Sequence, residues 1–213
     1  MIFYSPIEGD AFTGKVAYRP RTCFLMTQLG QPVAPVVVQI RKRLATILSE
    51  RNINLMDAND VVTGKDFLMK IWRLIVAVPL GVAVIDHQMS PQTLSNIFYE
   101  IGMLQAYGKE SLIIKTPETG IPSDFLRTEY VEFGPNFEKN LRKYLQSFFN
   151  QAEYYVSVAN QLENNPLLAI DYLRRAYLIT GKEELRSLAR QIFEDASIEG
   201  RAKNSVEMIL ADF

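Results

Sequence analysis

The sequence predicts an α/β protein with a doubly wound parallel sheet of about five strands, followed by a small all-helical module. Two observations carry this prediction. Short apolar runs of strand length alternate with longer runs of helical period up to about residue 134, and no strand pattern follows. Such alternation indicates βαβ units with right-handed crossovers, which gives a flavodoxin-like arrangement.

The expected strands are short apolar segments, as is typical of strands buried on both faces of a parallel sheet. They cover residues 22–28, 53–58, 81–86, 111–116 and 129–133. Helical spacing of apolar residues predicts helices over 36–52, 65–78 and 90–108, with Arg41, Lys42 and Arg43 towards water and Trp72 in the core. In the third helix Ser90 is a candidate N-cap, Pro91 suits the first turn and Gly108 ends the helix.

The chain therefore divides into three parts. Residues 1–20 contain scattered Pro and Gly and are expected to form an irregular arm, and residues 21–134 form the α/β domain. Residues 135–213 form a helical module with a long helix over 137–162 and shorter helices after it. The pair 164–181 and 182–196 resembles a tetratricopeptide-type hairpin, although one unit does not establish a repeat.

Composition excludes several classes of function. The net charge of −1 does not suggest a surface that binds nucleic acid. Cys23 is the only cysteine and His87 the only histidine, so an intrachain disulfide and a Cys/His metal site are excluded by count. The start lacks a signal-peptide pattern, and the longest apolar run, 74–85, is too short to span a bilayer. A cytoplasmic protein without a membrane partner is expected.

Ligands of an open parallel sheet bind at the carboxyl ends of its strands. Met26, Thr27, Gln28 and Gly30 end the first strand, and this turn could cradle a phosphate or ribose through backbone donors. Asp60 follows the second strand. Asp86 follows the third, where it could hold a ribose hydroxyl or cap the next helix, and His87 is read as a loop residue.

The most unusual residue is Glu100, a carboxylate set among apolar residues of the third helix. Four-residue steps place it on one side of that helix with Asn96, Met103 and Tyr107. That side borders an expected core stripe of Leu94, Phe98, Ile101 and Gln105. Partial desolvation there raises a carboxyl pKa, which suits a working carboxylate and equally the polar edge of a core helix.

Residues 22–116 together resemble the TIR-like and nucleoside 2-deoxyribosyltransferase-like domains of bacteria. The resemblance is carried by "GVAVID" and "SNIFYEIGMLQAYGKE" and by the acidic residue after the second strand. The matching positions are Asp60, Asp86, Asn96, Phe98, Tyr99, Glu100, Gly102, Gly108 and Lys109. "FLMTQLG" departs from the Met-Pro-Phe of those domains.

The resemblance implies cleavage of an N-glycosidic bond by Glu100, with Asp86 or Asp60 as the acid where the leaving base needs a proton. It implies substrate contacts at Met26, Thr27, Gln28, Gly30, Asp60, Asn96 and Tyr99. The first expectation is an NAD glycohydrolase-like hydrolase that acts in bacterial defence signalling. No cofactor or metal is expected, and NAD or another nucleotide is the candidate substrate.

Two alternatives remain open at the level of sequence. The pocket could bind a nucleotide as a signal without turning it over, which the altered "TQLG" segment favours. The chain could also be a nucleoside 2-deoxyribosyltransferase, against which the helical module argues. The module itself is expected to serve self-association into a homo-oligomer or the sensing of a partner.

Overall fold

The computed structural model describes residues 9, 16–30, 32–58, 67–125, 128–162, 164–196, 207, 210 and 213. The chain divides into two compact units, one of residues 21–146 and the other of residues 1–20 with 147–213. Most of the expected arm over 1–20, and most of the segment after residue 196, lie outside the described residues.

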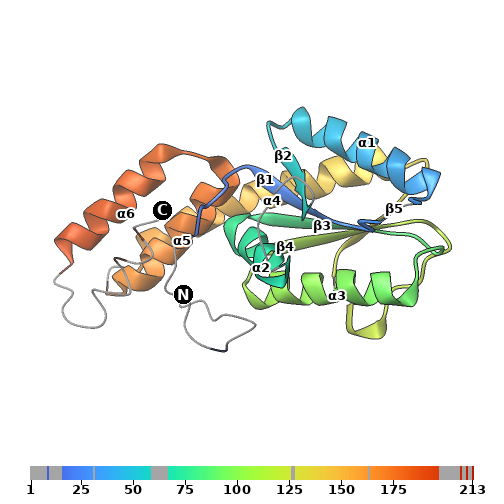
Figure 1. Cartoon of the computed structure of the whole chain (residues 1–213). Coiled ribbons are helices and arrows are strands. Elements are labelled where there is room, and N and C mark those ends of the chain that lie inside the picture. The colour runs from blue at the N-terminus through green and yellow to red at the C-terminus, as the bar shows by residue number, and fades with distance from the viewer. Residues whose placement is uncertain are drawn as a thin grey trace. The chain divides into compact units, whose positions relative to one another are not determined.

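The first unit is built on a five-stranded parallel sheet with the order β2-β1-β3-β4-β5 (Figure 1). The strands are β1 (Thr22–Met26), β2 (Asn54–Asp57), β3 (Leu80–Ile85), β4 (Glu110–Lys115) and β5 (Tyr130–Glu132). β1 and β3 are buried along their whole length. The predicted doubly wound, flavodoxin-like sheet is confirmed, and its strand order reverses between β1 and β3.

Helices cover both faces of this sheet. α1 (Pro35–Ser49) lies on one face, and α2 (Phe67–Ala77) and α3 (Pro91–Ala106) lie on the other (Figure 1). Ser90 caps α3 by accepting a hydrogen bond from the backbone N–H of Thr93, and Gly108, at φ +62°, follows its end. The short helix η2 (Ser123–Phe125) interrupts the connection from β4 to β5. No helix in the described residues has both the length and the apolar character that crossing a bilayer requires.

α3 approaches the sheet closely at Gly81 of β3. A Cβ atom at Gly81 would lie 2.2 Å from Cδ1 of Leu104 and 3.0 Å from Cε of Met26. Leu104 and Met26 are themselves buried, so they occupy the space that a side chain at position 81 would need. A side chain at position 81 would therefore require Leu104 and Met26 to move from their places in the core.

The core stripe of α3 differs from the expected one. The buried residues are Ile97, Ile101, Met103 and Leu104. Gln105 is exposed instead, and its Nε2 donates hydrogen bonds to Oγ1 of Thr128 and Oγ of Ser111. Phe98 is only partly buried because it packs on Phe125, with ring centroids 4.9 Å apart. The expected core stripe is therefore rotated about the helix axis relative to the observed one. The side of α3 that carries Phe98 and Gln105 meets the β4–β5 connection.

The long helix α4 (Phe137–Asn160) contributes residues to both units. Its first ten residues belong with the sheet, because Phe137 packs edge-on against Phe133 and Arg142 forms an ion pair with Glu50 of α1. The division therefore falls at residue 146, inside one helix, whereas the sequence pattern divides the chain at residue 134. Because α4 continues without interruption from one unit into the other, the local sequence gives no sign of the boundary between them.

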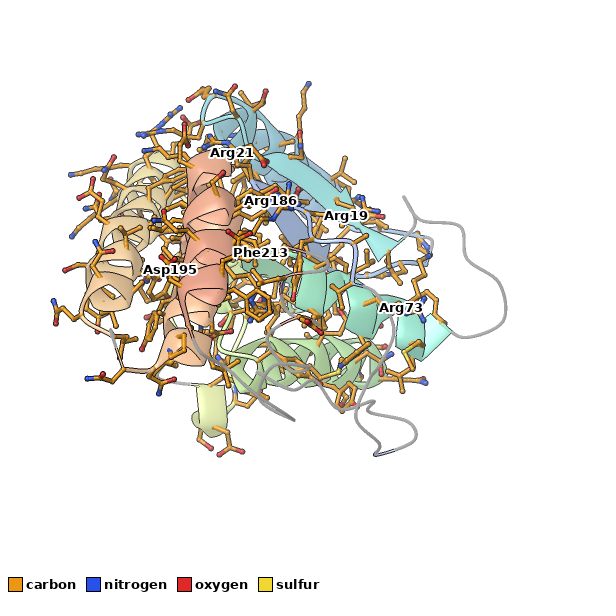
Figure 2. All side chains as sticks on the ribbon, turned by 90° about the vertical axis from the view of Figure 1, so that its left-hand side faces the viewer. Arg19, Arg21, Arg73, Arg186, Asp195 and Phe213 are labelled. Atoms are coloured by element: carbon orange, nitrogen blue, oxygen red, sulfur yellow. The ribbon has the colours of Figure 1, made fainter. Side chains whose placement is uncertain are left out.

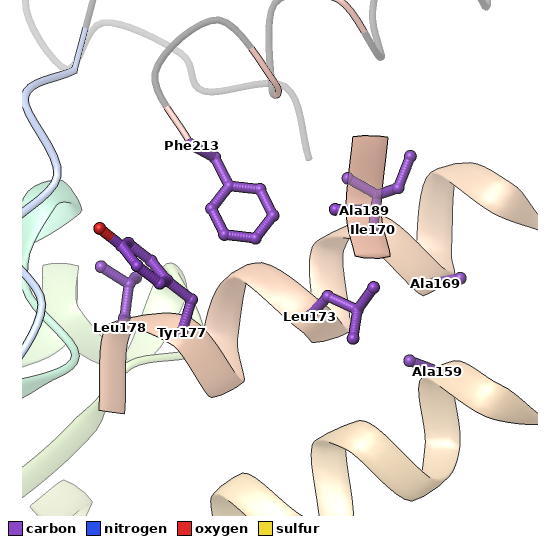
Figure 3. Packing of buried hydrophobic residues seen from close by; sticks show 8 residues of the cluster. All are labelled: Ala159, Ala169, Ile170, Leu173, Tyr177, Leu178, Ala189 and Phe213. Carbon is purple, nitrogen blue, oxygen red and sulfur yellow. The ribbon is translucent and has the colours of Figure 1, made fainter. Parts of the chain in front are cut away.

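The second unit contains the rest of α4 with α5 (Pro166–Thr180) and α6 (Glu183–Asp195). Asn165 caps α5, and Gly181, at φ +70°, ends it, so the predicted helix is confirmed. Phe213 is fully buried and packs on Tyr177, with ring centroids 5.3 Å apart, as Figure 3 shows. The predicted pairing of α5 with α6 is present, because both contribute to one apolar cluster.

The close approach at Gly81 makes a testable prediction about stability. We expect Gly81→Ala to destabilise the protein by about 1–3 kcal/mol, because the added Cβ forces Leu104 and Met26 to move within a filled core. Urea unfolding measures this change. Gly102→Ala is the matched control, since a Cβ at this helical glycine meets nothing within 4 Å and should be neutral or stabilising. Equal effects at the two positions would contradict the steric argument.

Candidate functional site

The end of β1 directs two of the predicted contact residues into the fold. Met26 is 1% exposed and lies against Gly81 and Leu104, as described above. Thr27 is also buried, and its Oγ1 donates a 3.2 Å hydrogen bond to the carbonyl of Val84 in β3. Both side chains hold β1 in the sheet, so a ligand at this edge would reach their backbone before their side chains.

The loop after β1 is held by Gln28. Its Nε2 donates a 2.8 Å hydrogen bond to the carbonyl of Pro32 and a 3.4 Å bond to that of Gly30. Gly30 is exposed, and a Cβ there would meet open space. The loop is thus shaped by its own side chain and stays accessible at Gly30. Asp60, predicted at the end of β2, lies outside the described residues.

Asp86 follows β3 and is 0% exposed. Its Oδ1 accepts a 3.0 Å hydrogen bond from the backbone N–H of Gln88, and its Oδ2 accepts one of 3.0 Å from Oγ1 of Thr116. Thr116 in turn shares a 2.7 Å hydrogen bond with Thr119. Asp86 therefore ties the end of β3 to the end of β4. It does not cap α3, because Ser90 does.

His87 lies in the turn after Asp86, as its loop reading predicts. Its Nδ1 is 3.3 Å from Oδ2 of Asp86, and its Nε2 is 3.5 Å from Oε2 of Glu118. The imidazole is exposed on the outside of this arrangement. It therefore covers the buried carboxylate from the solvent side.

Two sides of α3 have different neighbours. Phe98 and Gln105 meet the β4–β5 connection, whereas Tyr107 meets α2 by accepting a 2.6 Å hydrogen bond from Nε1 of Trp72. Glu100 lies seven residues before Tyr107 and so on the same side of the helix. Trp72 is fully buried as predicted, and the next residue, Arg73, is exposed on α2 (Figure 2). Glu100 therefore lies on the side of α3 that faces α2.

Glu100 is the one carboxylate in the described residues whose pKa is raised clearly by burial. The side chain is partly buried, and desolvation raises its pKa from 4.5 to about 7. Among the described residues, Glu100 has no hydrogen bond or ion pair that would offset the free-energy cost of burying its charge. The neighbouring predicted contacts Asn96 and Tyr99 are both exposed, Tyr99 by 52%.

Sequence reasoning missed one ion pair at the opposite side of the sheet. Asp57 at the end of β2 is buried, and its Oδ2 lies 2.5 Å from Nη2 of Arg41 in α1. Arg41 was expected to point towards water. A carboxylate at the end of a buried strand needs a partner, and this requirement is the signal that could have indicated the pair.

The described residues contain no cluster of three or more His, Cys, Asp or Glu side chains arranged to hold a metal ion. Glu100 and Asp86 are also not joined to each other by a hydrogen bond or an ion pair in the described residues. The candidate site thus consists of an accessible loop at Gly30 and a lone carboxylate on α3, with Asp86 held inside the fold.

No family model matches the sequence, and no curated protein matches it. Among solved structures, the chain is similar to a 2-deoxyribosyltransferase from Bacillus psychrosaccharolyticus, with a TM-score of 0.42, 9% sequence identity and coverage of 57% of this chain and 90% of that one. It is also similar to the CMP N-glycosidase BcmB of Clostridium botulinum, with a TM-score of 0.40, 20% identity and coverage of 60% and 98%. Likenesses at this level do not establish a shared activity, so function must be argued from the side chains.

The role of Asp86 can be tested through its partner Thr116, which directly follows β4. We expect Thr116→Val to destabilise the protein by about 1–3 kcal/mol, because a buried carboxylate loses a hydrogen-bond donor. Thr116→Ser keeps the hydroxyl and should cost less. Thermal and urea unfolding of the two variants measure the difference. Equal stability of the valine and serine variants would show that the hydroxyl is not needed.

Proposed function

We propose that the chain cleaves the N-glycosidic bond between a ribose and a base, with NAD as substrate and Glu100 as the carboxylate that acts on the sugar. The observation that carries this proposal is the state of Glu100. It is partly buried and without a partner among the described residues, and its pKa is raised to about 7. Carboxylates in such environments are concentrated at functional sites. The sequence resemblance supports the same position.

The chemistry needs one ionised carboxylate near the sugar. The bond between C1′ of the ribose and the ring nitrogen breaks, and its electron pair leaves with the base. Positive charge of oxocarbenium type develops on the sugar, and the Glu100 carboxylate stabilises it or forms an ester with C1′. Water then attacks C1′ and releases its proton to the solvent or to Glu100.

The proposal of NAD follows from the state of the second carboxylate. An adenine or pyrimidine base needs a proton as it leaves, whereas nicotinamide in NAD already carries a positive charge and leaves as a neutral molecule. Asp86 is fully buried, and its oxygens accept hydrogen bonds from Gln88 and Thr116, so they are not presented to a leaving base. A leaving group that needs no acid suits this arrangement best.

The other predicted residues take separate roles in this proposal. Gln28 and Gly30 form the accessible loop where a phosphate or ribose could meet backbone donors. The exposed Asn96 and Tyr99 on α3 are proposed substrate contacts. Met26, Thr27 and Asp86 are proposed as positioning residues, because their side chains bond or pack within the fold.

A non-catalytic nucleotide-binding module is the second candidate. It is favoured by the inward orientation of Thr27 and Asp86, which removes two expected side-chain contacts from the ligand. Such a module would bind the same nucleotide and leave its bond intact. A deoxyribosyltransferase would instead exchange bases on deoxynucleosides.

A base-release assay separates these functions. Purified protein is incubated with NAD, and separately with deoxynucleosides plus a free base, and the products are followed by chromatography. We expect nicotinamide to appear, and Glu100→Gln to lower its rate of release by about a hundredfold or more, because the amide cannot carry the negative charge. Glu129→Gln, which makes the same change at an exposed carboxylate, is the matched control.

The outcomes are distinct. Base exchange without hydrolysis would indicate the transferase, and tight NAD binding without either product would indicate the binding module. Turnover that survives in Glu100→Gln would remove Glu100 from the mechanism whatever the substrate.

The raised pKa of Glu100 gives a second test. As a nucleophile or stabiliser Glu100 must be ionised, so kcat/KM should rise with pH to a plateau above about 7. Because the folded pKa exceeds the unfolded value of 4.5, the folded state holds the proton longer, and its stability falls as pH rises from about 4.5 to 7. This loss in the free energy of unfolding should be on the order of 3 kcal/mol and absent from Glu100→Gln. A profile that falls through pH 7 would assign Glu100 as an acid instead.

A further inference from the structure

An arginine interrupts the apolar stripe of α1. Val37 and Leu44 are buried on the side of α1 that packs on the sheet, and helical steps of four and three residues place Arg41 between them. The Arg41 side chain is accordingly only 34% exposed, whereas its neighbours Lys42 and Arg43 are exposed residues. A charged side chain in such a stripe costs free energy unless it has a partner.

The partner of Arg41 places its guanidinium beside the carboxyl edge of the sheet. Asp57, whose Oδ2 is 2.5 Å from Nη2 of Arg41, is the last residue of β2. It lies opposite Leu25, one residue before the end of β1. The side chain of a helical residue leans towards the start of its helix, and α1 starts after the loop that contains Gly30. The guanidinium therefore lies beside the strand ends, on the face that α1 covers.

Most hydrogen-bond donors of this guanidinium are unused. Among the described residues, Arg41 makes one side-chain hydrogen bond, from Nη2 to Asp57. The donors on Nε and Nη1 remain, and a guanidinium presents its donors as a planar fork that matches two oxygens of a phosphate. Asp57 also restricts the direction of this fork, which lowers the entropy lost when a ligand binds.

A buried ion pair of this kind is weak evidence for a stabilising role. Taking two charges out of water costs free energy that their attraction often only repays, and well-packed apolar residues at such positions are frequently as stable. An apolar residue at position 41 would continue the stripe of Val37 and Leu44. The pair instead holds a cation at the edge where parallel sheets bind their ligands.

We propose that Arg41, held by Asp57, binds a phosphate group of the substrate, so that the site accepts nucleotides and discriminates against nucleosides. This inference rests on the proposed N-glycosidic activity and adds the substrate class to it. The strand order reverses between β1 and β3, and dinucleotides bind across the crevice at such a point. One ligand there meets helices of both faces, with Arg41 on α1 and Glu100 on α3 (Figure 1). In NAD the pyrophosphate is attached to the ribose that loses its base, so one molecule presents both groups.

Paired variants of the full chain separate recognition from folding. Arg41→Gln alone leaves the buried Asp57 without this cation and is expected to destabilise the fold. The double variant Arg41→Gln with Asp57→Asn removes both charges and keeps two polar side chains, so we expect its fold to be retained. Arg41→Lys keeps the charge and loses the planar fork. Lys42→Gln, which removes an exposed cation of the same helix, is the matched control. Thermal unfolding compares the stability of all variants.

Two substrates that differ only at the ribose 5′-oxygen test the phosphate contact. NAD carries a pyrophosphate there and nicotinamide riboside does not, and both release nicotinamide. We expect the double variant to lower kcat/KM for NAD by about tenfold or more, through KM, because hydrogen bonds to a charged group are lost. Its kcat/KM for nicotinamide riboside should be unchanged. Arg41→Lys should show a smaller loss for NAD, and Lys42→Gln should show none.

A binding measurement keeps this proposal distinguishable from the glycosidase proposal. ADP-ribose contains the pyrophosphate and lacks the bond to nicotinamide, so its affinity, measured by isothermal titration calorimetry, does not depend on turnover. Binding that the double variant weakens by about tenfold, without nicotinamide release from either substrate, would support the phosphate contact and contradict the glycosidase.

Three results would overturn the phosphate contact. They are equal losses of kcat/KM for NAD and nicotinamide riboside, equal affinity of the wild-type protein and the double variant for ADP-ribose, and no binding of ADP-ribose to the wild-type protein. Should the double variant prove unfolded, the same comparisons between the wild-type protein and Arg41→Lys decide the outcome.

Discussion

The rest of the α/β unit depends on one steric constraint, the missing side chain at Gly81. Leu104 and Met26 occupy the space where a Cβ would stand, so α3 rests on β3 with Leu104 inward. This contact sets the rotation of the helix about its axis. Ile97 and Ile101 then follow Leu104 into the core, and the residues one step around the helix face α2.

The same rotation fixes the environment of Glu100. A residue adjacent to the buried stripe is neither solvated fully nor packed fully, and this position raises its pKa to about 7. The hydrogen bond from Trp72 to Tyr107 holds the facing sides of α2 and α3 together at the end of the helix. A glutamine would fit the position without the cost of desolvating a charge. The fold therefore does not require a charge at position 100, and burial makes the ionised carboxylate costly there.

Local patterns predicted the helices and strands, because the periodicity of each element appears in residues that are close together in the sequence. The five strands, the Ser90 cap and the end of α5 at Gly181 follow from such signals. The rotation of α3 did not follow, because it depends on Gly81, which lies 23 residues earlier than Leu104 in the chain. A stripe through Gln105 and one through Leu104 differ by only one residue in register.

In the candidate site too, the sequence predicts the positions of single residues but not their contacts with residues distant in the chain. The sequence places Asp86 at the end of β3 correctly, but its partners are Thr116, which follows the neighbouring strand β4, and the imidazole of His87. The partner of Asp57 is Arg41, sixteen residues away on a helix whose charged side was expected to face water. The sequence thus predicts where charged residues follow the strands. Which residues pair with them becomes known only from the folded structure.

The contrast between the two carboxylates narrows the chemistry that this fold can support. The oxygens of Asp86 accept hydrogen bonds from the backbone N–H of Gln88 and from Oγ1 of Thr116, so this carboxylate is held inside the fold. Glu100 has the opposite environment, in which the ionised form is costly until positive charge approaches it. In the proposed reaction, positive charge moves from the leaving base onto the sugar, so the positive charge beside Glu100 grows as the transition state is approached. The interaction is then stronger in the transition state than in the ground state, which is the condition for a group to accelerate a reaction.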